Sequence, residues 1–236
     1  VTDGELPEGW ELQKLDNVSK SISDGDHQPP PKTKVGIPFI TISNVNKRSN
    51  SIDFSYTFFV SESYYQNLKE NRKPVVGDIL YTVTGSFGIP VLIDYQKEFC
   101  FQRHISLIRP LDSINRKYLY YLLQSPIVFN QATATATGTA QKTVSLKSLR
   151  NFIIPVPPLE VQDLIVQEIE SRLSVCDIVA ETITKGIQQA ETLRQSILKK
   201  AFEGKLVKAA GTAVEEQVNQ LKDTAAQAGQ YQISFE

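Results

Sequence analysis

The residues best suited to chemistry in this sequence are hydrogen-bond donors that could contact a nucleic acid. Gln102, Arg103 and His104 follow one another within an otherwise apolar stretch. Their side chains can donate to base edges or to phosphates. For His104, a strand histidine that is satisfied by hydrogen bonds to its neighbours is the alternative interpretation. The segment alone leaves both interpretations open.

Three further groups of donors have two interpretations each, DNA contact or a solvated surface. Gln141 and Lys142 end a segment rich in Thr, Ala and Gly (133–143), whose hydroxyls could face a phosphate backbone. The segment 44–48 reads as a hairpin tip, and two lysines lie beside the triple proline 29–31. The candidate DNA-binding residues are Lys32, Lys34, Asn44, Lys47, Arg48, Ser86, Gln102, Arg103, His104, Gln141 and Lys142.

Motifs for catalysis, cofactor binding or metal binding are missing from the sequence. The loop Thr84–Gly88 contains Gly-Ser-x-Gly, not the Gly-x-Ser-x-Gly of a nucleophile elbow, and its two glycines predict a tight hairpin. No phosphate-binding loop or dinucleotide fingerprint occurs. The two cysteines and two histidines have no zinc-ligand spacing. We predict no catalytic residues, no metal and no cofactor for this chain; an enzyme built on the Gly85–Gly88 loop is the rival hypothesis.

The composition is that of an ordinary soluble globular protein, with 41% apolar and 22% charged residues in a chain of 236. No run approaches the ~18 apolar residues of a membrane span, and no signal segment opens the chain. Cys100 and Cys176 do not suggest a disulfide framework, so we expect a cytoplasmic location. There is no methionine, so residue 1 is not an untouched start site.

The charges are distributed unevenly although the net charge is only −1. Residues 1–150 carry 17 Lys and Arg against 14 Asp and Glu, whereas residues 151–236 carry 8 against 12. A mildly basic body joined to an acidic rod permits DNA contact by the body. This asymmetry alone does not demonstrate such contact.

The body, residues 1–154, is predicted to be α+β. Strands are expected at 10–15, 37–42, 79–83, 89–95 and 99–109, and helices at 61–68, 115–125 and 127–133. Ser61 and either Ser113 or Asn115 are suitable helix caps. A long loop is expected over residues 24–36, which contain three consecutive prolines.

A single long helix is predicted from Leu159 to Phe202, ending at Gly204. Its 44 residues would span roughly 66 Å, and its heptad pattern lasts more than four repeats, so we expect a partner helix. The residues predicted to form this dimerisation seam are Ile169, Leu173, Cys176, Val179, Ile183, Ile187, Ala190, Leu193 and Ile197. An intramolecular core contact is the alternative interpretation of the same pattern.

Three parts of the chain are therefore expected. Residues 1–154 form the body, and residues 155–207 comprise a proline hinge and the long helix. Residues 208–236 form a tail with a short helix around Val214–Ala225 and a strand at Tyr231–Phe235. We expect that strand to dock on a body domain.

Six sequence blocks resemble the specificity subunits of type I restriction-modification enzymes, over about residues 6–207. The last two blocks are the most specific. The blocks are Leu6–Trp10 (Leu-Pro-Glu-Gly-Trp), Gly36–Ile40 with Asn44, Gly77–Leu80 with the Gly85–Gly88 loop, Gly138–Gln141 with Val144–Ser145, Ile154–Gln162, and Leu193–Leu206.

The resemblance implies a function in DNA recognition without catalysis. Such subunits have two target recognition domains, each followed by a long helix, and the two helices pair antiparallel as a spacer between two half-sites of double-stranded DNA. Methylation subunits that use S-adenosylmethionine dock on this scaffold, and restriction subunits join for cleavage. No cofactor is expected on the specificity subunit itself.

This sequence departs from the family pattern because it has one recognition domain, one helix and no internal repeat. It is either a half-length subunit or a fragment. The simplest partner for its seam is a second copy, and a two-fold dimer would read a symmetric split site. The alternative is a coiled-coil interaction protein without DNA specificity.

Overall fold

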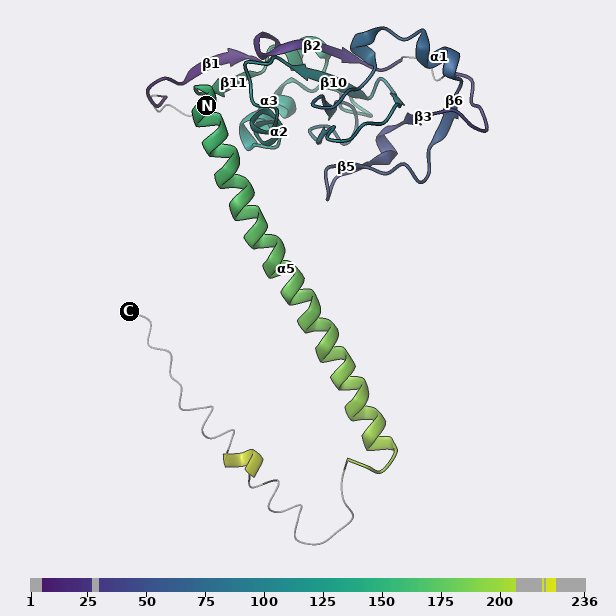
Figure 1. The fold of residues 1–236 in the computed structure, drawn as a ribbon, viewed down its shortest axis with the longest axis vertical. Coiled ribbons are helices and arrows are strands. Elements are labelled where there is room, and N and C mark those ends of the chain that lie inside the picture. Colours follow the sequence, from purple (N-terminus) through teal and green to yellow (C-terminus); the bar gives the residue numbers. More distant parts are fainter. Residues whose placement is uncertain (1–5, 27–29, 207–217, 219, 224–236) are drawn as a thin grey trace. The chain divides into compact units, whose positions relative to one another are not determined.

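The computed structural model describes residues 6–26, 30–206, 218 and 220–223 and confirms an α+β chain (Figure 1). The chain divides into two compact units between Glu170 and Ser171. The strands are β1 Glu11–Lys14, β2 Ser19–Asp24, β3 Ile37–Ile40, β4 Val45–Asn46, β5 Ser51–Ile52, β6 Phe58–Val60, β7 Ile79–Thr82, β8 Pro90–Leu92, β9 Cys100–Phe101, β10 Ile105–Pro110 and β11 Ile153–Val156. The helices are α1 Glu62–Gln66, α2 Arg116–Leu123, α3 Pro126–Thr135, α4 Leu146–Arg150 and α5 Leu159–Phe202.

The main sheet has four antiparallel strands in the order β2-β10-β7-β8. Both of its faces are covered, so β10 alternates between two cores. Ile108 belongs to the larger core, which includes residues of α2, α3 and α4. Ile105 and Leu107 belong to a second core with Phe99. This explains why most residues of β7 and β10 are apolar.

The expected strand over 99–109 is two strands, β9 and β10, separated by Gln102–His104. β9 pairs in parallel with β3, whereas β10 pairs with β2 and β7 of the main sheet. The chain changes sheets at this point, so the three residues between the strands form a loop. The donors at 102–104 therefore lie on a loop and not within a strand.

The proline-rich run before α5 begins with a strand, β11, so the predicted hinge at residue 155 starts inside a paired strand. β11 pairs antiparallel with β1, and Pro155 stands opposite Leu12. Proline is tolerated because this sheet has only two strands, so one side of β11 needs no donors. The strands β2 and β11 and the helix α4 were not expected from the sequence.

Helix starts follow the expected capping chemistry. The Asn115 side chain accepts from the backbone nitrogens of Lys117 and Tyr118 and begins α2. Ser61 accepts from Tyr64 N and begins α1. The α5 bounds Leu159–Phe202 are those predicted, and Gly204 follows with φ +70°. These ends are set by local chemistry, which explains why the sequence located them.

The first turns of α5 are attached to the rest of the first compact unit through a buried glutamine. Gln162 is 1% exposed. Its Oε1 accepts from Asn115 N at 2.8 Å, and its Nε2 donates to Pro157 O at 2.8 Å. Val166, one turn later, lies in the larger core. The compact unit therefore continues to Glu170, past the predicted boundary at 154.

The tail predictions fall mostly outside the described residues. Residues 218 and 220–223 are helical, and the strand expected at Tyr231–Phe235 lies outside the described part. Among the described residues, no helix combines the length and the hydrophobicity needed to cross a membrane.

We predict that Gln162→Ala lowers the free energy of unfolding by about 1–3 kcal/mol, because Asn115 N–H and Pro157 C=O lose their buried partner. Gln189→Ala is the matched control, since Gln189 is exposed on the same helix. Urea unfolding followed by circular dichroism measures both. Equal effects of the two changes would contradict the anchoring role of Gln162.

Candidate nucleic-acid interface

Three loops that are distant in sequence meet at one end of the main sheet. They are the β7–β8 loop (83–89), the β9–β10 loop (102–104) and the segment 137–143 that follows α3. Val83 N donates to His104 O at 2.9 Å, and Gly85 N donates to Lys142 O at 3.0 Å. Val144 N donates to Val83 O at 2.8 Å. The β7–β8 loop thus lies between the other two.

Glycines let these loops approach one another. Gly85 has φ +70°, and a Cβ there would lie 3.0 Å from Gln141 Nε2. Gly138 has φ +111°, and its Cβ would lie 2.4 Å from Gln141 O. The expected hairpin at Gly85–Gly88 is present, and Thr82 closes it by donating to Ser86 O at 2.8 Å. The hairpin turn therefore explains why Gly85 and Gly88 are glycines.

The loops border a cavity of about 350 Å³, whose lining combines polar and apolar side chains. Arg103 and Gln141 are exposed at it, and His104 is partly buried. Arginine, glutamine and histidine can donate to base edges, whereas Asp24, which also lines the cavity, can only accept while ionised. The lining residues are Asp24, Val83, Thr84, Arg103, His104, Ser106, Gln141, Thr143, Val144, Ser145 and Leu146.

Ser106 supplies an unusual hydroxyl to this lining. The residue is 0% exposed, and its Oγ has no hydrogen-bond partner among the described residues. A buried hydroxyl without a partner costs free energy, so such groups often accompany a bound water or a functional site. Sequence patterns could not reveal it, because Ser106 interrupts an apolar strand without any motif.

His104 is held in its neutral form by its surroundings. Burial, and secondly the positive charge of Arg103, lower the pKa of His104 below its ordinary value. A neutral imidazole has one donor and one acceptor nitrogen. At neutral pH, His104 therefore offers directional hydrogen bonds without charge.

The structure brings together only part of the predicted set. Arg103, His104 and Gln141 line the cavity. Ser86 and Lys142 are exposed on the same loops, and Gln102 is half-buried beside them. Asp24, Ser106 and Ser145 were not among the predicted site residues, since nothing in the local sequence shows that residues so far apart meet.

The remaining predicted donors lie away from the cavity lining. Lys47 and Arg48 are exposed at the tip between β4 and β5, a hairpin as expected. Lys32 and Lys34 are exposed before β3, and Lys32 Nζ lies 4.7 Å from the centroid of the Phe58 ring. Their positions add positive charge to the surface but no side chain to the cavity.

Asn44 is buried, whereas the sequence suggested a residue that is free to contact DNA. It is 6% exposed, and its Oδ1 accepts from Thr41 N at 3.0 Å. Its Nδ2 donates to the carbonyls of Asp53 and Tyr56, both at 3.2 Å. These bonds occupy the amide, so Asn44 supports the hairpin and does not present donors to DNA.

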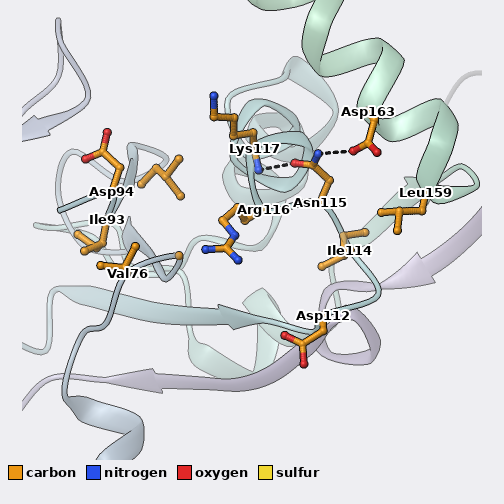
Figure 2. Close-up of a pocket in the computed structure, with 12 residues that line it drawn as sticks. Val76, Ile93, Asp94, Asp112, Ile114, Asn115, Arg116, Lys117, Leu159 and Asp163 are labelled. Carbon is orange, nitrogen blue, oxygen red and sulfur yellow. Dashed lines mark hydrogen bonds between the residues drawn. The ribbon is translucent and has the colours of Figure 1, made fainter. Parts of the chain in front are cut away.

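A second cavity, a groove of about 440 Å³, lies where α5 begins (Figure 2). Asn115 Nδ2 donates to Asp163 Oδ1 at 2.6 Å, and Figure 2 shows these two side chains facing each other. Leu159 and Ile114 supply apolar surface, and Arg116 and Asp112 supply opposite charges. The groove is bordered by the start of α2, the first turns of α5 and the segments around Val76 and Ile93.

In the described structure, the side chains of the predicted α5 seam within residues 171–202 are exposed to solvent. All residues of the second unit that belong to α5, 171–202, are exposed. Val179 is 51%, Ile183 57% and Ile187 66% exposed. Exposed aliphatic side chains repeated at heptad spacing mark an interaction surface.

Comparisons with known proteins give a consistent result. The chain matches the model of the type I restriction modification DNA specificity domain over residues 7–190. It is 28% identical over 206 residues to the type I restriction enzyme EcoBI specificity subunit of Escherichia coli, covering 85% of this chain and 43% of that subunit. It is 28% identical over 207 residues to the putative MjaX specificity subunit of Methanocaldococcus jannaschii, covering 84% and 47%. The chain spans about half the length of these relatives.

Solved structures show the same fold. The crystal structure of the HsdS subunit from Thermoanaerobacter tengcongensis matches with a TM-score of 0.62 at 24% identity, over 87% of this chain and 47% of that one. A chain from a structural study of complex assembly and conformational transition of the type I R-M system matches with a TM-score of 0.67 at 23% identity.

We predict that Arg103→Ala raises the pKa of His104, because the nearby cation is one cause of its lowered value. The chain has two histidines, so proton NMR can follow both imidazoles during a pH titration. Lys142→Ala is the control, since Lys142 is not among the causes of the shift. An unchanged pKa in Arg103→Ala would contradict the inferred proximity of the two side chains.

Proposed function

The chain belongs to the family of type I restriction-modification DNA specificity subunits. We propose that its first compact unit, which ends at Glu170 and is called the recognition unit below, reads one half of a bipartite DNA target. The observation that carries this proposal is the convergence of three loops on a cavity with Arg103, His104 and Gln141 in its wall. Arginine and glutamine are suited to bidentate contacts with guanine and adenine in the major groove. Exposed Lys142 and Lys47 are suited to phosphates.

Within such an enzyme the chain acts as a scaffold and not as a catalyst. Methylation subunits bound to it supply S-adenosylmethionine and the methyl transfer, and restriction subunits supply cleavage. The chain positions these partners on the DNA and binds no cofactor itself. Its half-length relationship to the curated relatives makes a second recognition unit necessary for a bipartite target.

We propose that the second unit is another copy of this chain, paired through the seam of α5. The seam residues Leu173, Val179, Ile183, Ile187 and Ile197 are exposed. A two-fold pair would bury both seams and would place two identical readers on DNA, which predicts a symmetric split site. A coiled-coil scaffold without DNA specificity remains the second candidate, which the same seam favours.

Binding-site selection from random duplexes distinguishes the two candidates. We expect the full chain with its methylation subunits to enrich a split motif. Arg103→Ala should then cost about 1–3 kcal/mol at one base position of each half-site, as expected for a base contact. Arg48→Ala, at the distant hairpin tip, should cause no position-specific loss. An absence of any enriched motif would contradict the DNA-reading proposal.

Light scattering tests the self-pairing. We expect a mass near twice 26.4 kDa at micromolar concentration. Ile183→Glu should give monomers, because it places a charge in the apolar seam. Thr184→Glu, one residue further and also exposed, should leave the dimer intact. A monomeric parent chain would argue against the self-paired seam.

A further inference from the structure

A small hydrogen-bonded network contacts the β9–β10 loop. Its centre is the Asp26 carboxylate, two residues after β2. Tyr64 of α1 donates its hydroxyl to Asp26 Oδ2. Arg72 Nη1 donates to Asp26 Oδ1 at 2.7 Å, and Arg72 Nη2 donates to Asp24 Oδ1 at 3.2 Å. Burial, and secondly the bond to Asp26, raise the pKa of Tyr64, so its hydroxyl stays a donor.

The backbone of Asp26 holds the loop directly. Asp26 forms a parallel bridge with Gln102, and Arg103 N donates to Asp26 O at 3.3 Å. Asp26 is therefore bound on both sides. Its side chain is fixed by α1 and by the segment at Arg72, and its main chain is fixed to the loop.

Gly25 makes this contact unusually close. A Cβ at Gly25 would lie 2.0 Å from Phe101 O and 2.6 Å from the carbonyl carbon of Gln102. Such distances exclude any side chain, so the strand end and the loop are in backbone contact. A displacement of Asp26 is therefore transmitted to Gln102 and Arg103.

We propose that Tyr64 and Arg72 are positioning residues that fix the Gln102–His104 loop through Asp26 and thereby determine base discrimination. This inference rests on the proposed DNA reading. Neither side chain lines the cavity, so both act on specificity through the loop. Base contacts require accurate placement of their donors, whereas phosphate contacts tolerate displacement.

Tyr64→Phe tests the proposal, because it removes one hydroxyl and changes no charge. In the full chain, the ratio of affinities for the selected duplex and a random duplex should fall about tenfold, within the range that one base contact provides. The loss should be confined to one base position, and affinity for the random duplex should not change. Combined with Arg103→Ala, the change should add no further loss.

Tyr65→Phe is the matched control. Tyr65 is the next residue and also loses a hydroxyl, but none of the hydrogen bonds between described residues joins it to Asp26. Its discrimination should equal that of the parent chain. If the two variants lose discrimination equally, the positioning role is wrong.

An arginine pair separates positioning from general stability. The Arg72 and Arg109 side chains are 28% and 22% exposed, and each binds aspartate. Arg109 binds Asp78 through Nε at 2.9 Å and Nη2 at 2.8 Å, and it lies near the other end of β10. Arg109 also donates to Glu70 O at 3.4 Å and to Lys73 O at 2.9 Å, so Arg109→Ala loosens the segment around Arg72 but leaves the bonds from Arg72 to Asp26 in place. Arg72→Ala should therefore lower discrimination more than Arg109→Ala does. Equal losses of discrimination would overturn the proposal.

Hydrogen exchange provides a test that needs no DNA. In Tyr64→Phe the Arg103 amide should exchange about fivefold faster, since its acceptor carbonyl belongs to a less restrained Asp26. Unchanged exchange would overturn the network itself. Faster exchange, in a chain whose parent form selects no duplex, would support the network and would count against the proposed function.

Discussion

The burial of β10 on both faces is the constraint on which the recognition unit depends. β10 pairs with β2 on one side and with β7 on the other, and its side chains enter two cores. In this register Ile105 stands opposite Thr82, and Ser106 stands opposite Asp24. The start of β10 thus lies beside the ends of β7 and β2. A one-residue slip would place every apolar side chain of β10 on the wrong face, so the loops at this end share a fixed frame.

The second unit follows a different physical rule. Residues 171–202 have no core of their own within the described structure, and their apolar side chains repeat along an exposed helix. Isolated helices gain little from intrinsic propensity, and Gly186 in the middle of this one lowers it further. The first turns are held by Gln162 and Val166. The stability of the remainder therefore depends on what covers the seam.

Local chemistry decided which elements could be predicted. The α5 bounds and the caps Ser61 and Asn115 depend on neighbouring residues, and they were found where expected. β2 was missed because it is an edge strand with a single large apolar residue, Ile22, and therefore shows no alternation. β11 was missed because Pro155 normally argues against a strand.

The sequence indicated which residue types form the site, but not which residues come together in the fold. Arg103, His104 and Gln141 could be named because of their donors. Their meeting requires pairings such as Thr84 with Thr143, which are 59 residues apart. The buried Asn44 shows the converse error, since a donor-rich sequence cannot show that the donors are already occupied by backbone carbonyls. Long-range register and hydrogen-bond satisfaction are properties of the folded chain alone.

The charge balance constrains how such a unit could recognise DNA. The body, with 17 Lys and Arg against 14 Asp and Glu over residues 1–150, gains only modest long-range attraction to a polyanion, and Asp24 in the cavity lining is paired with Arg72. A lining that holds a carboxylate together with the donors of Arg103 and Gln141 suits base edges, which present both donors and acceptors. Under the proposed function, such a unit obtains its selectivity from the geometry of its donors. Rigid loops are then essential, because a displaced donor loses its contact with a base edge.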